Sequence, residues 1–211
     1  MAKSAADDLL AVLDAEGVPT GDAAPAERVH ADGSWHAAVV VWVVRRDGQV
    51  LMRRVPEDDP CEPLRLAASA HAHLGPGAPA PAAAAAVERQ LGVAARPGRL
   101  THVGSFRSER RGRGGTVDRE HQEAYVLQDD TPLEELALDP RSVDTVYEVP
   151  LARAIALVEE GTYVPAPGFD SMQRVSNALL VAEDLPESGR EALRAQLRAL
   201  AAASPQAAAS E

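Results

Sequence analysis

Two carboxylates, Asp118 and Glu120, stand one residue apart in the stretch VDREHQEAYVL. Residues i and i+2 of a β-strand share a face, so both side chains can point at one ion. Just upstream, FRSERRGRGG gathers arginines in a chain whose net charge is −11. Guanidinium groups match phosphate oxygens, and glycines let a loop close over a ligand. We expect a flexible basic loop there that either binds an anionic substrate or is simply solvated. It spans residues 109–115, and its candidate anion-binding side chains are Arg110, Arg111 and Arg113.

The bulk composition leads us to expect a cytoplasmic protein. The 211 residues suit one domain, which we place at 1–200, followed by a disordered tail at 203–211. The acidic charge argues against nucleic acid, which needs a basic surface, and against a polybasic membrane anchor. No signal peptide is apparent, and the longest apolar run, 37–44, is too short to span a bilayer. A single cysteine, Cys61, excludes an internal disulfide.

The residue patterns predict strands, one helix, further strands and then C-terminal helices. β-Branched runs favour strands, and Asp47-Gly48 predicts a hairpin turn. Prolines early in an alanine-rich run are compatible with the first turn of a helix. This order indicates an α+β fold with a mixed sheet. We expect strands at 36–44, 49–54, 100–106, 120–127 and 145–149, a strand or helix at 7–15, a loop at 55–65, and helices at 78–91, 151–160, 169–182 and 187–202.

Five stretches together resemble the Nudix superfamily, and within it the branch that contains isopentenyl diphosphate isomerase. They are DLLAVLDAEGVPTG, RVHADGSWHAAVVVWVV, DGQVLMRRVPEDD, the helix ending QLGV, and VDREHQEAYVL. The resemblance covers residues 8–180. It implies an α/β/α sandwich with a mixed sheet.

The helix that ends at Gly92 departs from this family. A Nudix box carries Arg-Glu and a Glu-Glu pair, whose glutamates bind divalent metal. Here those positions hold Ala85-Ala86 and Arg89-Gln90, while the box's early glutamate falls on Gly77 or Ala78. Methyl groups cannot hold Mg²⁺, which requires oxygen ligands. We therefore expect the usual Nudix hydrolase site to be absent.

The isomerase branch has a second metal site, built from three histidines and two acids, and here the resemblance is closer. An ungapped alignment puts the third histidine at Ala72, so the histidines on either side of it both stay open. Three imidazoles and two carboxylates suit Zn²⁺, Mn²⁺ or Fe²⁺ better than Ca²⁺, so we expect one of these ions, or Mg²⁺, as cofactor. The implied ligands are His30, His36, His71 or His73, Asp118 and Glu120.

The resemblance also implies roles in catalysis. A glutamate and a cysteine move protons in the isomerase, and the glutamate corresponds to Glu120. The cysteine's place falls near Ser69 or Ala70, and a serine is a poor acid or base without help. Arg53 and Arg54 resemble the position that contacts diphosphate.

Three functions stay open. The first is an atypical Nudix-fold enzyme that uses the His/Asp/Glu centre for proton transfer, isomerising or cyclising a small, isoprenoid or diphosphate substrate in secondary metabolism. The second is an inactive binding or regulatory protein. The alanine-rich helix favours it, because a helix with no catalytic residues to keep accumulates good helix formers. The third is a Nudix hydrolase of a diphosphate compound with displaced carboxylates at 57–59. The expected partner is a small molecule, and a homodimer stays open.

Overall fold

The computed structural model describes residues 9–151, 153, 154, 187, 191 and 195. The helices expected at 151–160, 169–182 and 187–202, and the tail at 203–211, lie wholly or largely outside them. The main feature is a nine-stranded sheet. Its strands are β1 (Leu9–Leu13), β2 (Pro19–Pro25), β3 (Trp35–Val44), β4 (Gln49–Arg54), β5 (Leu66–Ala67), β6 (Ala70–His73), β7 (Leu100–Arg111), β8 (Val117–Gln128) and β9 (Thr145–Pro150).

Strand β3 lies at the centre because it pairs along both of its edges. On one edge it runs parallel to β8 over its whole length. On the other edge it pairs antiparallel with β1, β6 and β4 in turn. Antiparallel pairing of β7 with β8 and of β9 with β4 widens the sheet. The sheet is therefore mixed, which confirms the α+β prediction.

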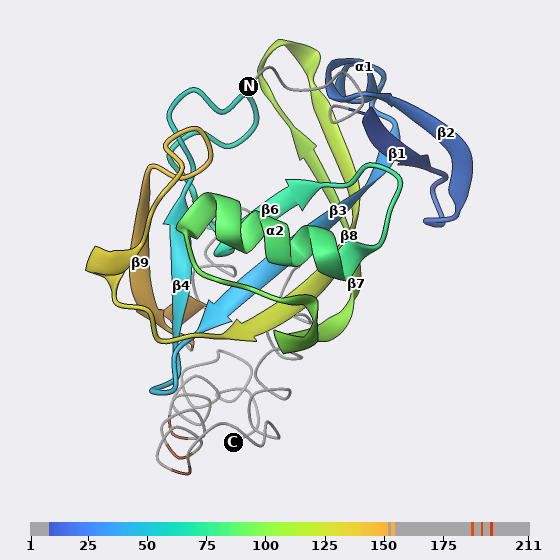
Figure 1. Ribbon diagram of the computed structural model, residues 1–211. Helices are drawn as coiled ribbons and strands as arrows, with labels where there is room; N and C mark the ends of the chain where they lie inside the picture. Colours follow the sequence, from blue (N-terminus) through green and yellow to red (C-terminus); the bar gives the residue numbers. More distant parts are fainter. Residues whose placement is uncertain (1–8, 152, 155–186, 188–190, 192–194, 196–211) are drawn as a thin grey trace, which may run out of the picture.

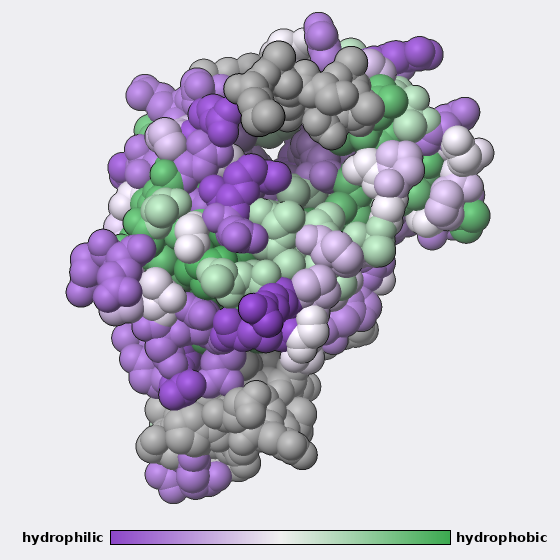
Figure 2. Space-filling view, viewed as in Figure 1, coloured by the Kyte–Doolittle hydropathy of each residue, from purple (hydrophilic) through white to green (hydrophobic). Residues whose placement is uncertain are grey.

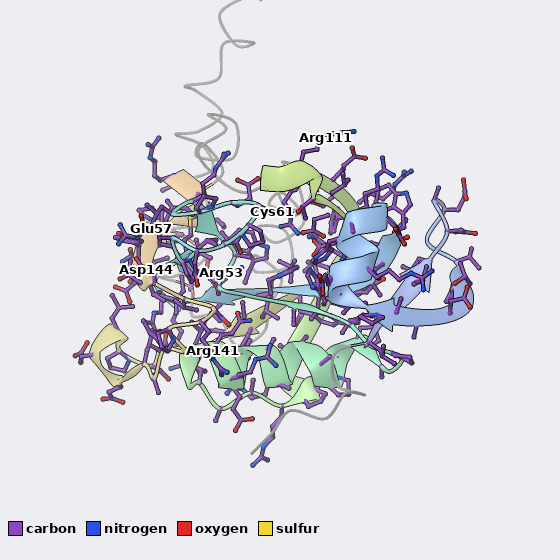
Figure 3. The ribbon with its side chains drawn as sticks, turned by 90° about the horizontal axis from the view of Figure 1, so that it is seen from above. Arg53, Glu57, Cys61, Arg111, Arg141 and Asp144 are labelled. Carbon is purple, nitrogen blue, oxygen red and sulfur yellow. The ribbon has the colours of Figure 1, made fainter. Side chains whose placement is uncertain are left out.

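The two faces of β3 have different neighbours. Val39, Val41 and Val43 belong to a buried cluster that includes residues of helix α2 (Pro79–Leu91). Alternate residues of a strand point to opposite faces, so His36 faces away from α2. Figure 3 shows α2 on one side of the sheet, with helix α1 (Ala26–Asp32) and the loop that carries Cys61 on the other side. The front view shows α2 lying across the sheet (Figure 1).

Helix α2 begins and ends close to where the sequence predicts. Pro79 and Pro81 occupy its first turn, where an N–H has no partner within the helix. It ends at Gly92, which has a φ of 71°. Two short 3-10 helices follow later in the chain, η1 (Pro97–Arg99) and η3 (Leu133–Glu135), and Gly92 lies against the segment just after η3. A Cβ atom at Gly92 would stand 2.6 Å from the Cβ atom of Ala137. Only glycine fits both the backbone conformation and this contact.

We expect Gly92→Ala to lower the free energy of unfolding by at least about 2 kcal/mol, from left-handed backbone strain and the clash with Ala137. Urea unfolding followed by circular dichroism measures this. Gly98→Ala is the control, because a Cβ atom at Gly98 meets no atom within 4 Å. Equal effects of the two substitutions would contradict this account of the helix end.

Several short elements are not predicted by the residue patterns: β2, β5, β6 and α1. Strand β2 has the sequence PTGDAAP and is mostly exposed, and it forms by pairing with β1. The segment at 7–15, for which a strand and a helix stayed open, is strand β1. No helix in the described part of the chain is long and apolar enough to cross a membrane.

The prediction of a flexible loop at 109–115 is wrong for the first half of that range. Strand β7 continues to Arg111, and β8 begins at Val117. A tight turn joins them, in which the amide of Gly112 donates to the carbonyl of Thr116 at 2.8 Å and η2 (Arg113–Gly115) forms the tip. Pairing with β8 therefore orders the arginine-rich stretch.

Candidate metal centre

Three imidazole rings converge on one carboxylate on the face of the sheet that points away from α2. The Nε2 atoms of His36, His30 and His73 lie 3.3, 3.7 and 4.0 Å from Oδ1 of Asp118. The four ligand atoms all lie within 4.8 Å of one another. All four atoms are buried, and none has a hydrogen-bond partner among the described residues. Buried polar atoms are almost always satisfied, so four such atoms facing one point fit a metal ion.

The strand register explains why these residues meet. His36 of β3 lies opposite Glu120 of the parallel strand β8, and Asp118 is two residues earlier on the same face. On the other edge of β3, Ala38 pairs with His73 of β6. His30 belongs to the last turn of α1. This helix ends at Gly33, whose backbone has a left-handed conformation.

Glu120 is fully buried beneath this group. Its Oε1 lies 2.7 Å from Nε2 of His71 and 2.9 Å from Nε2 of His73. Its Oε2 accepts from the amide of Gln122 and lies 2.6 Å from Nη2 of Arg110. Burial alone raises the pKa of Glu120, but His71 and Arg110 outweigh it and hold the pKa well below its ordinary value of 4.5. The side chain is therefore ionised at neutral pH.

Both histidines that the sequence left open face the centre, because His71 and His73 lie two residues apart on β6. Both lie beside Oε1 of Glu120, and His73 lies beside Asp118 as well. Nε2 of His73 belongs to the group around Asp118, whereas Nε2 of His71 forms a hydrogen bond with Glu120. Burial lowers the pKa of His71. Burial also acts to lower the pKa of His73, but the nearby carboxylate of Glu120 outweighs it and raises the pKa overall.

The five predicted anion-binding arginines have different environments. Arg110 is buried in the centre and pairs with Asp118. Arg111 projects outward at the end of β7 and pairs with Glu109 at 2.9 Å (Figure 3). Arg54 pairs with Asp144, whereas Arg53 donates to the carbonyl of Ser142 and lines a cavity at the centre. The backbone of Arg113 lies in η2.

A cavity of about 140 Å³ opens onto the centre. Its lining joins the histidines to Arg53 and to the loop between β4 and β5, including Asp59 and Cys61. Burial raises the pKa of the Cys61 thiol to about 11, so the thiol is protonated at neutral pH. No pattern in the sequence predicts that Cys61 lines this cavity, because a loop has no periodicity that would show which way a residue points.

Ser69 has a structural role in the sheet. Its hydroxyl donates to the carbonyl of Leu51 at 2.5 Å and accepts from the amide of Val43 at 2.7 Å. The side chain is fully buried, and Ser69 does not line the cavity. These bonds assign it to strand packing and not to the proton transfer expected from its sequence position.

We expect Ser69→Ala to lower the free energy of unfolding by about 1–3 kcal/mol, because it leaves the buried amide of Val43 without an acceptor. Metal content should stay unchanged. Urea unfolding and elemental mass spectrometry measure the two quantities, with Ser105→Ala as the exposed control. Unchanged stability together with lost catalysis would restore the proton-transfer role of Ser69.

Helix α2 contributes no residue to either group of described residues that could hold a metal. Ala85 is exposed and Ala86 is buried in the core, and Figure 2 shows the outward side of α2 as a pale green area. Gln90 forms two hydrogen bonds with the backbone of His71: it accepts from the amide at 3.2 Å and donates to the carbonyl at 2.6 Å. Within the described residues, both groups that could hold a metal lie at the His/Asp/Glu centre.

The comparisons with known proteins bear on the fold. No protein-family model matches the sequence, and no curated protein matches it either. The structure is similar to DR0079 from Deinococcus radiodurans, with 15% identity, 79% of this chain and 98% of that chain covered, and a TM-score of 0.59. Weaker similarities include the C. elegans Ap4A hydrolase (14% identity, 68% and 96% covered, TM-score 0.47) and the NUDIX domain of Shewanella oneidensis NrtR, solved with ADP ribose (14%, 67% and 84%, 0.47).

At identities this low, such similarity concerns the fold alone. The chain has an α+β fold with a mixed sheet, similar to the fold of DR0079. On that fold it carries a His/Asp/Glu group that could bind a divalent metal.

Proposed function

We propose that the protein is a metal-dependent hydrolase of a small anionic substrate, and that its metal is held by His30, His36, His73 and Asp118. One observation carries the proposal: the four ligand atoms of these residues are buried, converge, and have no hydrogen-bond partner in the described part of the chain. The donor set of three nitrogens and one oxygen suits Zn²⁺, Fe²⁺ or Mn²⁺. A bound divalent cation would supply Lewis-acid activation of a water molecule or of a substrate oxygen.

The charges at the cavity favour an anionic substrate. Asp118 and Glu120 carry two negative charges, and Arg110 cancels one of them. A divalent cation would make the centre net positive. Arg53 adds a further guanidinium to the lining, which suits a phosphate or carboxylate group.

His71 is our proposed general base. It lines the cavity, and burial lowers its pKa, so the ring is neutral and can accept a proton. Its hydrogen bond to Glu120 fixes the orientation of the ring. Glu120 itself is a poor proton carrier, since its pKa is held well below neutrality. For this reason we rank hydrolysis above the isomerase-type reaction that the sequence resemblance favoured.

Isomerisation by proton transfer is the second candidate, and the placement of Cys61 supports it. This thiol lines the same cavity in its protonated form, so it can donate a proton. The ionised carboxylate of Glu120 lies behind the histidines. The two groups stand in opposite protonation states, which is the arrangement that a donor and an acceptor require.

The test compares metal-stripped protein with protein reloaded with Zn²⁺, Mn²⁺, Fe²⁺ or Mg²⁺. Phosphate release from ADP ribose and from a dinucleoside tetraphosphate reports hydrolysis, and deuterium uptake by isopentenyl diphosphate reports isomerisation. We expect hydrolysis that depends on metal, is lost in His71→Ala and persists in Cys61→Ala. Deuterium uptake that Cys61→Ala abolishes would favour the second candidate. No turnover in either assay, with substrate bound, would favour a binding protein.

A further inference from the structure

Arg110 contacts one oxygen of each of the two carboxylates at the centre. Its Nη2 lies 2.5 Å from Oδ2 of Asp118 and 2.6 Å from Oε2 of Glu120. The other oxygen of each carboxylate points toward the imidazoles: Oδ1 of Asp118 toward His30, His36 and His73, and Oε1 of Glu120 toward His71 and His73. One guanidinium therefore contacts both of the oxygens that point away from the imidazoles, Oδ2 of Asp118 and Oε2 of Glu120, which we call the outer oxygens.

The fold holds Arg110 in this position. Arg110 of β7 lies directly opposite Asp118 of β8 in the antiparallel pairing. Its side chain is only 10% exposed, although it belongs to the stretch that composition alone marks as a solvated loop. Gln122 donates to the same outer oxygen of Glu120 at 2.5 Å. The outer oxygens are thus occupied by side chains from within the sheet.

We infer that Arg110 limits the coordination number of the metal centre: by holding the outer oxygens of Asp118 and Glu120, it leaves each carboxylate one oxygen at most for a metal and favours a four-coordinate ion such as Zn²⁺ over Mn²⁺, Mg²⁺ or Ca²⁺. This inference rests on the proposed metal centre. Mg²⁺ and Ca²⁺ take six or more oxygen ligands, and bidentate carboxylates are a main source of them. Arg110 removes that source.

The ligand spacing agrees with this inference. Ligands about 2.0–2.2 Å from a tetrahedral Zn²⁺ lie about 3.4 Å apart. The three distances from Oδ1 of Asp118 to the imidazole nitrogens run from 3.3 to 4.0 Å. The four ligand atoms all lie within 4.8 Å of one another, so an inward shift of the side chains would complete a four-coordinate shell without a second carboxylate oxygen.

Cobalt spectroscopy of the full chain tests the role of Arg110. Four-coordinate Co²⁺ absorbs visible light strongly, and five- or six-coordinate Co²⁺ absorbs weakly. We expect strong absorption in the wild type and weak absorption in Arg110→Gln, with the ratio of Zn²⁺ to Mn²⁺ affinities falling at least about 10-fold in that variant. Arg110→Lys keeps a cation beside both carboxylates and should restore the strong spectrum. Arg111→Gln is the matched control, because this neighbouring arginine pairs with Glu109 at the surface.

Each outcome decides the question. An unchanged spectrum and affinity ratio in a folded Arg110→Gln protein would overturn the inference while leaving the metal centre intact. If circular dichroism shows that Arg110→Gln does not fold, the Arg110→Lys and wild-type spectra decide: weak absorption in the wild type overturns the inference. A wild type that binds no Co²⁺ at all would overturn the proposed metal centre, and the inference with it.

Discussion

His73→Ala is expected to lose its metal, whereas His71→Ala, two residues earlier on the same strand, is expected to keep it. Nε2 of His73 is one of the four converging atoms, and Nε2 of His71 is instead bonded to Glu120. Removing a direct ligand should weaken Zn²⁺ binding by more than about 100-fold, which exceeds the usual effect of a residue that only supports the ligands. For His71→Ala we expect at most about a 10-fold loss.

Equilibrium dialysis against Zn²⁺ with elemental mass spectrometry measures both affinities. His102→Ala is the control, because His102 is an exposed histidine that pairs with Glu123 on the other side of β8. The two β6 variants should also differ in catalysis, with metal retained but turnover lost in His71→Ala. Equal metal loss in the two variants would show that both histidines are ligands, and would contradict the division of roles described above.

Glu120→Ala is expected to lower the free energy of unfolding of the metal-free protein by about 1–3 kcal/mol, because it leaves buried hydrogen-bonding groups without a partner, while Arg110 keeps its pair with Asp118. Glu120 is fully buried, and the side chain of Arg110 is 10% exposed. The substitution also removes the acceptor for His71 and Gln122. Glu123→Ala is the control: this carboxylate is 33% exposed and pairs with a half-exposed histidine, so we expect at most about 1 kcal/mol. Equal effects would contradict the buried network.

Lowering the pH should remove the stabilisation that the ionised Glu120 carboxylate gives to the wild-type fold. The pKa of Glu120 in the folded protein lies well below its ordinary value of 4.5. A carboxyl with a lowered pKa stabilises the fold above the unfolded pKa, and this stability disappears as the pH falls through the folded pKa. Urea unfolding of metal-free protein, repeated downward from neutral pH, should therefore give a difference between wild type and Glu120→Ala that shrinks only below about pH 4.5. A constant difference would contradict the assigned ionisation.

The central part of the fold is predictable from the sequence because its signals are local. The β-branched run of β3, the Asp47-Gly48 turn and the prolines and glycine that bound α2 each specify their element. Strand β2 is different: its residues disfavour a strand, and it exists through pairing with β1. Strand β6 has only four residues, which is too short for periodicity to identify.

The site was predictable in part, through the family resemblance. The histidines and acids that it implied come together, but the residue patterns could not tell that His71 and His73 take different partners. The composition around Arg110, rich in glycine and arginine, predicts a flexible loop there. Recognising a hairpin turn between Gly112 and Thr116 would have put Arg110 opposite Asp118. That pairing is the long-range information that composition lacks.

The most direct test of the account is elemental mass spectrometry of the purified wild-type protein beside His36→Ala. His36 is fully buried, and its Nε2 atom has no hydrogen-bond partner among the described residues. We expect near-stoichiometric transition metal, chiefly Zn²⁺, in the wild type and almost none in the variant. Absence of metal from the wild type, even after incubation with Zn²⁺, Mn²⁺ and Fe²⁺, would contradict the metal centre and with it the proposed hydrolase.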